Sequence, residues 1–532
     1  MSEIALSPSE RRLHPESEQL FRILDTSTAA IGGVLVEEDF RLDVHDVGAC
    51  DPATLRGLVR LAERLAWAGA PDRLRLSGHD ARSAMGARLA ALGHPSPEPV
   101  RFAERIGTGR VPDGPAPERG PAGHGSPEAE LLATVFDAGA GAVDRIAHAV
   151  ESIRRAFFRC DYEVMLLAAL TGAELCAPGL RVDGADIDTA LTAAGIRSRF
   201  ADAVEFEVGL LRGSVDVRAF FTKTVGMVHS FRGLHAEALD RFLAIAHDES
   251  VSHELRAQAS VYAALTRVKM MRDPRAGIAQ ADEGLALLDA AGADGDQARR
   301  ERGWLLNVRA LGAFTEGRIR DALGDEMSAL ACVNDGRDSS SVHLKINLIS
   351  NLSVLQERTG RYDGALATWL KYLTVGDAWG PMFTKHHAYR RGGLELAAGR
   401  PDAATAAYED AYTAAASLDD RFHRAVIALE LGTLHLETDR SAALDWFDTA
   451  IDAYAELADP HGQALALTGR ALATARAPGP EVAAMAAGSI TYPDEAAALA
   501  ARVRTGDVEG LAKALPRPRT KLNRPFDHVN LG

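Results

Sequence analysis

Two hydrophobic patterns divide the chain. Up to residue 106, short apolar runs alternate with helical stretches, whereas from residue 127 apolar residues recur at helical spacing and β-branched runs almost vanish. The first pattern is typical of strands mixed with helices, and the second predicts helices throughout. The predicted strands lie at residues 32–39, 41–47, 73–77 and 98–106, with predicted helices at Pro52–Ala68 and His79–Leu92. We therefore expect a small α/β domain at residues 1–106.

The other boundaries follow from composition. Residues 107–126 are dense in Gly and Pro and nearly lack large apolar side chains, so burial cannot offset the entropy lost on ordering them. We interpret them as a flexible linker. Divergent leading helices are expected at residues 127–199, helical repeats at 200–505, and an extended C-terminal tail at 506–532, where prolines oppose a helix.

Short turn sequences recur in the helical region every 39 to 44 residues. The turn residues are Gly233, Asp273, Gly317, Gly360, Gly399 and Asp439. A long helix precedes each turn, and small residues occupy the start of the next helix, at Ala238, Ala322, Ala365, Ala404 and Ala443. Glycine can end a helix in the left-handed conformation, and alanine lets two helix backbones approach closely. The pattern predicts a series of helical hairpins.

The best copy of this pattern runs from Asn351-Leu352 through Gly360-Arg361-Tyr362 to Leu366, and it resembles the tetratricopeptide repeat (TPR). The resemblance covers roughly residues 200 to 475, with a spacing longer than the family's usual figure of about 34. It implies a mostly α fold, a TPR-like right-handed α-solenoid, here with the small N-terminal α/β domain in front. It also implies a concave groove, lined by the first helix of each hairpin, that binds a peptide or protein segment.

Counting back 13, 10 and 9 residues from a turn glycine selects the helix face that would line this groove. The count gives Phe220, Lys223, Thr224, Trp304, Asn307, Val308, Asn347, Ser350, Asn351, His386, Tyr389 and Arg390. From this set we predict a binding groove of Lys223, Trp304, Asn307, Asn347, Ser350, Asn351, His386, Tyr389 and Arg390. Asparagine amides can pair with the backbone of an extended peptide, and the basic residues can hold a carboxylate. The alternative is that these side chains are simply solvated.

The N-terminal segment Leu58–Pro95 resembles a degenerate half of the GNAT acyltransferase fold. In that family, a glycine-rich loop presents backbone N–H groups to the cofactor pyrophosphate. The matching loop here, Gly48–Asp51, lacks the repeated glycines and carries an acidic residue, and Leu89 stands where a proton-donating tyrosine is expected. We therefore favour a unit kept for binding or docking over acetyl transfer. The pairs His45-Asp46 and His79-Asp80 are read as ordinary surface and capping residues, with general-base chemistry as the alternative.

Charge and cysteine content limit the function classes. The chain has 74 acidic and 59 basic residues, a formal charge of −15, and no basic cluster outside the C-terminal tail, which disfavours nucleic-acid binding. Its four cysteines are scattered without a CxxC pair, so we expect neither a metal site nor a disulfide framework. We see no signal peptide and no membrane span, and the Ala, Gly and Arg content suggests a bacterial source. We expect a cytoplasmic protein without cofactor or metal.

Two polar segments stand out from the repeats. Lys385–Arg391 is the densest polar cluster, and because adjacent histidines of a helix point in different directions, it favours a partner anchor over a metal site. Pro516–Gly532 is basic and proline-rich. This tail could lie along the acidic solenoid or bind a partner, with disorder as the alternative.

Three functions remain open on these grounds. The favoured one is an interaction scaffold or adaptor that binds a peptide or protein segment in the concave groove. The second is a regulatory protein that senses a peptide or a small molecule. The third is an enzyme or enzyme subunit of a bacterial biosynthetic pathway, which we disfavour because no catalytic constellation is visible.

Overall fold

The structure, a computed structural model, describes most of the chain. The described residues are 18–45, 47, 50, 52–77, 127–158, 161–176, 179–197, 206–336, 339–371, 380–489 and 493–520. The expected helix at residues 79–92, the expected strand at 98–106 and the expected linker at 107–126 lie outside them.

The described part of the chain is mostly helical. Its first elements are α1 (Glu18–Glu37), β1 (Leu42–Val44), α2 (Pro52–Trp67), the 3-10 turn η3 (Pro71–Arg73) and β2 (Leu74–Leu76). The helices that follow are α4 (Pro127–Phe136), α5 (Ala142–Phe158), α6 (Tyr162–Leu175), α7 (Gly184–Ala193), α8 (Ser214–Phe231), α9 (His235–Ala246), α10 (His253–Leu265) with its π-helical extension η6 (Thr266–Met270), α11 (Pro274–Ala290), α12 (Asp296–Thr315), α13 (Ile319–Val333), α14 (Ser339–Arg358) and α15 (Tyr362–Leu370). The last are α16 (Gly380–Ala397), α17 (Pro401–Ser417), α18 (Arg421–His435), α19 (Arg440–Glu456), α20 (Pro460–Ala473), α21 (Pro480–Ala487), α22 (Pro493–Thr505) and α23 (Val508–Ala514).

These elements form two compact units, and each is described by itself. The first unit comprises the described residues between 127 and 371, that is α4 to α15. The second unit joins two distant parts of the chain, the described residues between 18 and 77 and those between 380 and 520. The N-terminal elements therefore belong to one compact unit with α16 to α23.

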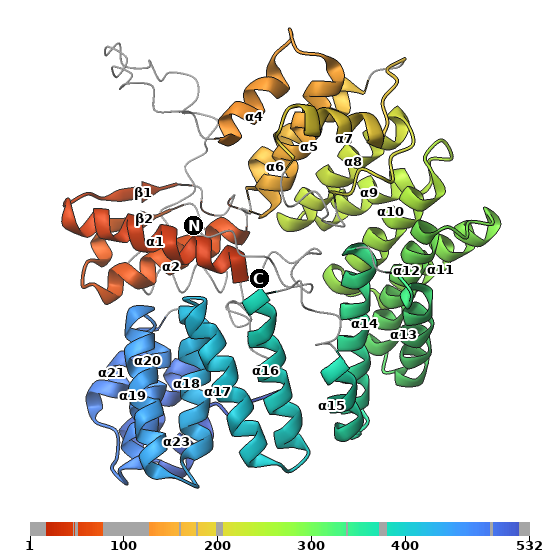
Figure 1. The fold of residues 1–532 in the computed structure, drawn as a ribbon. Coiled ribbons are helices and arrows are strands. Elements are labelled where there is room, and N and C mark those ends of the chain that lie inside the picture. Colours follow the sequence, from red (N-terminus) through yellow and green to blue (C-terminus); the bar gives the residue numbers. More distant parts are fainter. Residues whose placement is uncertain are drawn as a thin grey trace, which may run out of the picture. The chain divides into compact units, whose positions relative to one another are not determined.

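Both units are built from helical hairpins. Consecutive helices pack as pairs, α8 with α9, α10 with α11, α12 with α13 and α14 with α15 in the first unit, and α16 with α17 and α18 with α19 in the second (Figure 1). The first helices of successive hairpins also contact one another, as α10 contacts α12 and α18 contacts α20. This arrangement is an α-solenoid of TPR-like hairpins, as the repeats predict.

The turn chemistry predicted from the repeats is confirmed. Gly233, Gly317, Gly360 and Gly399 all adopt positive φ, between 73° and 80°. Two turns use another device, because Asp273 and Asp439 accept backbone N–H bonds at the start of α11 and α19. The predicted small residues Ala238, Ala322, Ala365, Ala404 and Ala443 are all fully buried. Close packing at these alanines therefore joins the two helices of each hairpin.

The expected first strand of the N-terminal segment is wrong. Residues 32–37 continue α1 instead of forming a strand, and Leu35 is buried against a small core that includes Val59 and Leu61 of α2. A short apolar run fits a buried helix face as well as a strand, and packing against α2 decides in favour of the helix. The predicted helix at Pro52 and the strands within 41–47 and 73–77 are present, and β1 pairs with β2 in parallel. Only part of the strand order expected from the GNAT resemblance is thus found, and the resemblance gains no support.

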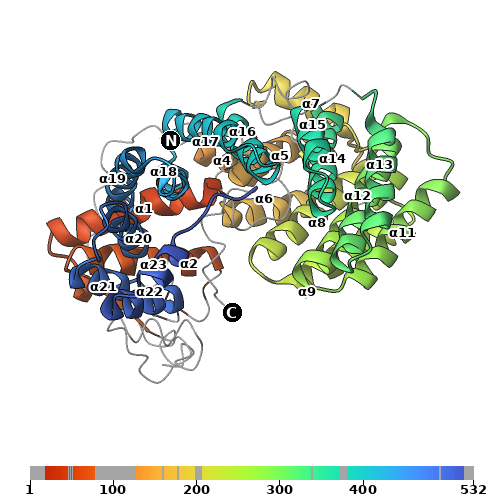
Figure 2. The same ribbon diagram turned by 90° about the horizontal axis from the view of Figure 1, so that it is seen from below.

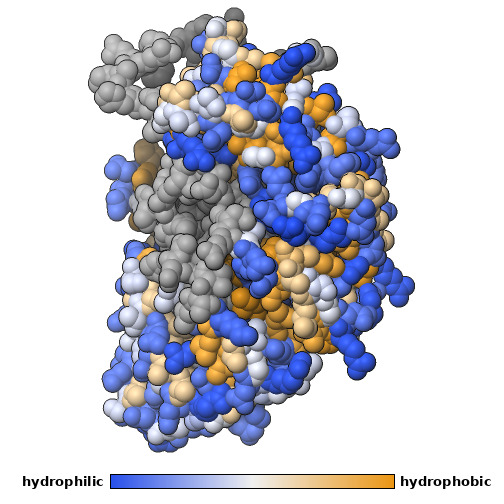
Figure 3. All heavy atoms as spheres, turned by 45° about the vertical axis from the view of Figure 1, so that its right-hand side comes forward, coloured by the Kyte–Doolittle hydropathy of each residue, from blue (hydrophilic) through white to orange (hydrophobic). Residues whose placement is uncertain are grey.

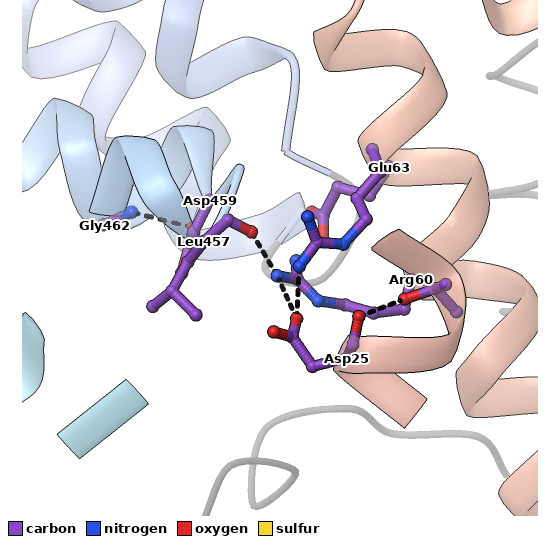
Figure 4. A network of polar contacts seen from close by, with 8 residues as sticks. Asp25, Arg60, Glu63, Leu457, Asp459 and Gly462 are labelled. Atoms are coloured by element: carbon purple, nitrogen blue, oxygen red, sulfur yellow. Dashed lines mark hydrogen bonds and ion pairs between the residues drawn. The ribbon is translucent and has the colours of Figure 1, made fainter. Parts of the chain in front are cut away.

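A buried polar network holds α1 and α2 against the C-terminal helices (Figure 4). The Arg60 guanidinium donates to the Asp25 carboxylate at 3.1 Å, to Glu63 at 3.1 Å and to the Leu457 carbonyl at the end of α19. Burial alone would lower the pKa of Arg60, but the charges of Glu63 and Asp25 outweigh it and raise that pKa. An ion pair between Arg64 and Asp25 completes the contact.

The surface carries hydrophilic and apolar side chains in mixture over the face that Figure 3 draws. Among the described residues, no helix is both long enough and apolar enough to cross a membrane. The same part of the chain holds no group of three or more His, Cys, Asp or Glu side chains arranged to bind a metal ion.

Candidate peptide-binding surface

The last described residues of the chain lie on α16 and α17 of the second unit. The expected extended tail begins at Leu515 and not at residue 506, because Asp507 caps α23 and residues 508–514 are helical. Leu515 is buried, and the chain then continues without regular structure to Thr520 (Figure 2). We call Leu515–Thr520 the tail segment. Its prolines at 516 and 518 lack N–H donors and favour an extended backbone.

Two tyrosines bind both backbone polar groups of Arg519. The Arg519 N–H donates to Tyr389 Oη of α16 at 3.2 Å, and Tyr408 Oη of α17 donates to the Arg519 carbonyl at 3.2 Å. The tyrosine rings pack edge to face with centroids 5.0 Å apart. In paired strands, one residue exchanges both of its backbone bonds with a neighbour in the same way. The tyrosine pair therefore acts on the tail segment as the edge of a neighbouring strand would.

Glu430 of α18 fixes the role of Tyr389. The Tyr389 hydroxyl donates to Glu430 Oε2 at 2.6 Å, so its oxygen is left to accept from the tail. Burial raises the pKa of Glu430 to about 8, against the opposing effects of the bond from Tyr389 and the positive charge of Arg519. Burial also raises the pKa of Tyr389 and that of Tyr408. Both phenols thus keep the protons that these hydrogen bonds require.

A glycine on α16 lets the tail backbone approach the helix. A β-carbon at Gly393 would lie 2.4 Å from Thr520 Cα and 2.5 Å from the Arg519 carbonyl oxygen, far inside van der Waals contact. Beside it, the buried guanidinium of Arg390 donates to the Thr520 carbonyl at 3.2 Å. We refer to Tyr389, Arg390, Gly393, Tyr408 and Glu430 together as the tail-binding surface.

Polar contacts one helical turn before Tyr389 on α16 stabilise this surface. The Lys385 ammonium, fully buried, pairs with the Asp420 carboxylate and lies 2.9 Å from His423 Nδ1. Asp420 also caps α18 by accepting the His423 N–H. Since Lys385 is four residues before Tyr389, it lies on the same helix face. The cluster therefore fixes α16 against α18 where Tyr389 meets Glu430.

The groove residues predicted on α8 and α12 are bound within the first unit. The Lys223 ammonium donates to Gln258 of α10 at 2.6 Å, and the Gln258 amide donates to Glu301 of α12 at 3.4 Å. Trp304 is buried, with 2% of its surface exposed. In the first unit, the predicted face therefore links the first helices of consecutive hairpins to one another. Its flanking residues Phe220, Thr224 and Val308 are buried too.

On α14 the predicted asparagines differ. The Asn351 amide donates to Asn307 at 2.8 Å and to the buried Glu326 carboxyl at 2.9 Å, so it links α12, α13 and α14. Burial raises the pKa of Glu326 well above its usual range. Asn347 and Ser350 are half-buried on the same helix. Binding by these two residues stays a prediction.

The predicted residues of α16 belong to the second unit and divide between two roles. Tyr389 and Arg390 bind the tail segment, as described above. His386 is half-buried and packs its ring edge to face with His423, at a centroid distance of 5.8 Å.

His45 of the N-terminal pair lies 2.8 Å from Ser77 Oγ, and the residues of the other histidine pair lie outside the described part of the chain.

Sequence reasoning missed Tyr408, Gly393 and Glu430. The same count of nine residues applied back from Asp439 gives Glu430, but the count starts only from glycines. Tyr408 lies on the second helix of its hairpin, which the count ignores. Gly393 shows no signal of its own, because only the tail above it makes a small residue necessary.

Comparison with known proteins shows distant structural similarity only. No family model and no curated protein matches the chain. Solved structures that are similar include the apo form of RapI (12% identity, 56% of this chain and 98% of that one, TM-score 0.32) and the Rap conjugation regulator of plasmid pLS20 with the Phr* peptide (11%, 70% and 98%, TM-score 0.34). A STAND protein with a TPR sensor from Pyrococcus horikoshii is similar at 10% identity, over 72% of this chain and 53% of that one, with a TM-score of 0.35. Similarity at this level does not extend to function.

Proposed function

We propose that this protein is a scaffold that binds an extended peptide or protein segment on the tail-binding surface of α16 to α18. The observation that carries the proposal is the pair of hydrogen bonds from Tyr389 and Tyr408 to the backbone of Arg519. Side chains that satisfy both main-chain groups of one residue recognise an extended chain largely independently of its sequence. Strand-like recognition of this kind is a recurring mode of peptide binding.

The close approach at Gly393 supports the same function. Because glycine has no side chain, the backbone of another segment can cross α16 in close contact at this position. A side chain on α16 at the same position would occupy that space. Arg390 adds a charged donor beside this position and is held almost fully buried.

The experiment uses a variant that ends at Leu515, so that the surface is uncovered. Fluorescence polarisation measures its binding of a labelled peptide, LPRPRTK, which copies residues 515–521. We expect saturable binding that Gly393→Leu abolishes. The matched control is Gly324→Leu, because Gly324 is also helical but a β-carbon placed there would meet nothing within 4 Å. Equal binding by the two leucine variants would remove the proposal.

Tyr389→Phe and Tyr408→Phe sharpen the test. Each change removes one hydrogen bond to the peptide backbone and leaves the ring in place. A single bond of this kind contributes about 0.5–1.5 kcal/mol, so each variant should bind about 2- to 12-fold more weakly. Unchanged affinity in both variants would show that the tyrosine pair does not recognise the peptide.

A further inference from the structure

The tail-binding surface is occupied by a segment of its own chain, and the chemistry of that segment is not arbitrary. Prolines at 516 and 518 alternate with arginines at 517 and 519. Arg517 pairs with Glu437 just beyond α18 at 3.0 Å. An acidic side chain of the second unit therefore faces a basic side chain of the tail segment.

The alternation also suits the backbone contacts. Pro516 and Pro518 have no backbone N–H and therefore need no hydrogen-bond acceptor there. The N–H of Arg519 does need an acceptor, and Tyr389 supplies it. Proline-rich chains are extended before they bind, which reduces the entropy lost on binding. A segment with alternating proline and basic residues thus fits this surface in both backbone and charge.

The hold on the tail segment is loose. After Leu515, none of its side chains is buried, and the side chains of Arg517 and Glu437 are 74% and 76% exposed. Exposed ion pairs contribute little, with typical values of about 0–1 kcal/mol. The tail stays bound mainly because Leu515 tethers it, and a short tether gives an effective concentration on the order of millimolar.

We propose that the tail segment is an internal competitor that covers the surface until a partner segment of the same class, extended and alternating proline with basic residues, displaces it. This inference rests on the proposed function and adds its partner class and its regulation. A partner must overcome the effective concentration of the tail. The affinity of the full chain for such a partner is therefore lower than that of a chain whose tail has been removed or released.

The test compares four forms of the protein by fluorescence polarisation with labelled LPRPRTK. They are the unmodified chain, a deletion of residues 516–532, a deletion of residues 521–532 that keeps the tail segment, and Arg519→Pro. The last removes the N–H that Tyr389 accepts while leaving the chain at full length. We expect the deletion of 516–532 to bind at least about tenfold more tightly than the unmodified chain. Arg519→Pro should lie between them, and the deletion of 521–532 should match the unmodified chain.

Peptide variants test the partner class. On the chain that lacks 516–532, LPEPETK and LARARTK should each bind several-fold more weakly than LPRPRTK, the first through charge and the second through lost preorganisation. Equal affinity of all four protein forms overturns the internal competitor while the proposed function stands. Equal affinity for all three peptides overturns the partner class. If none of the proteins binds any peptide, the proposed function fails as well. Thermal melts of each variant check that differences in binding do not come from unfolding.

Discussion

In the two units, the first helices of the hairpins carry similar polar residues and use them differently. In the first unit, Lys223, Gln258 and Glu301 form hydrogen bonds from one helix to the next. In the second unit, Lys385 pairs across to α18 in a similar way, but Tyr389, one turn further on, binds the tail segment as well. The same helix face can therefore join repeats or present a ligand site. The difference depends on whether a further chain segment is near.

The largest effect expected from this comparison is a loss of stability when the buried Lys385–Asp420 ion pair of the second unit is broken. Lys385→Ala should lower the free energy of unfolding by about 3–5 kcal/mol, because it leaves the buried Asp420 carboxylate without its cation. Urea titration followed by circular dichroism measures this. The control is Lys513→Ala, which breaks an exposed pair with Glu509 and should cost less than about 1 kcal/mol. Similar losses in both variants would mean that burial does not determine the contribution of the pair.

In the first unit, alanine substitutions at the two asparagines of α14 should differ in their effect on stability. Asn351→Ala removes bonds to Asn307 and to the buried Glu326, and should cost about 1–3 kcal/mol. Asn347→Ala alters a half-buried residue of the same helix and should change stability by less than about 0.5 kcal/mol. Thermal unfolding of both variants measures the contrast. If Asn347→Ala is the more destabilising change, the polar bonds of α14 do not join the repeats as described.

The turns should respond alike in both units. Gly360 and Gly399 have φ values of 73° and 79°, where a residue with a β-carbon costs about 1–2 kcal/mol. Gly360→Val and Gly399→Val should therefore each lower the melting temperature by a similar amount. Unequal shifts would show that the turn conformation is not the shared determinant of the two hairpins.

The smallest expected effect is a change in pH dependence. The Glu430 carboxyl keeps its proton up to about pH 8 in the folded chain, against an ordinary value of 4.5 when unfolded. The folded state thus binds more protons across this interval, and stability contributed by this group falls as pH rises through it. Glu430→Gln should flatten the slope of melting temperature between pH 5 and pH 8. Glu326→Gln should act in the same direction in the first unit, where burial also raises the pKa. A steeper slope in either variant would contradict the assignment.

Much of the hairpin architecture was predictable, because it rests on local chemistry. A glycine such as Gly360 after a long helix and an alanine such as Ala365 in the next one fix the turn and the helix contact within a few residues. The N-terminal segment was predictable only in part. Its apolar residues 32–37 fit a strand and a helix equally well until α2 packs beside them.

Only part of the tail-binding surface could be predicted from the sequence. Counting along α16 found Tyr389 and Arg390, since residues of one helix face follow a fixed spacing. Glu430, Tyr408 and Gly393 come from other helices or from a position without a signal, and the chain between Arg390 and Thr520 is too long for spacing to relate them. Lys223 shows the converse, because its position on the helix face was predicted correctly and its partner on α10 was not.

The sequence by itself determined that the chain folds into helical hairpins with defined turns, since helix periodicity, glycine conformation and alanine contacts depend on neighbours along the chain. Only the tertiary structure decided that residues 18–77 belong with α16 to α23, and that the tail segment lies on α16 and α17. Both outcomes depend on contacts between residues more than 100 positions apart, such as Arg60 with Leu457 and Tyr389 with Arg519. The free energy of such contacts depends on shape, burial and charge on two surfaces at once, and neither surface exists before the hairpins have formed.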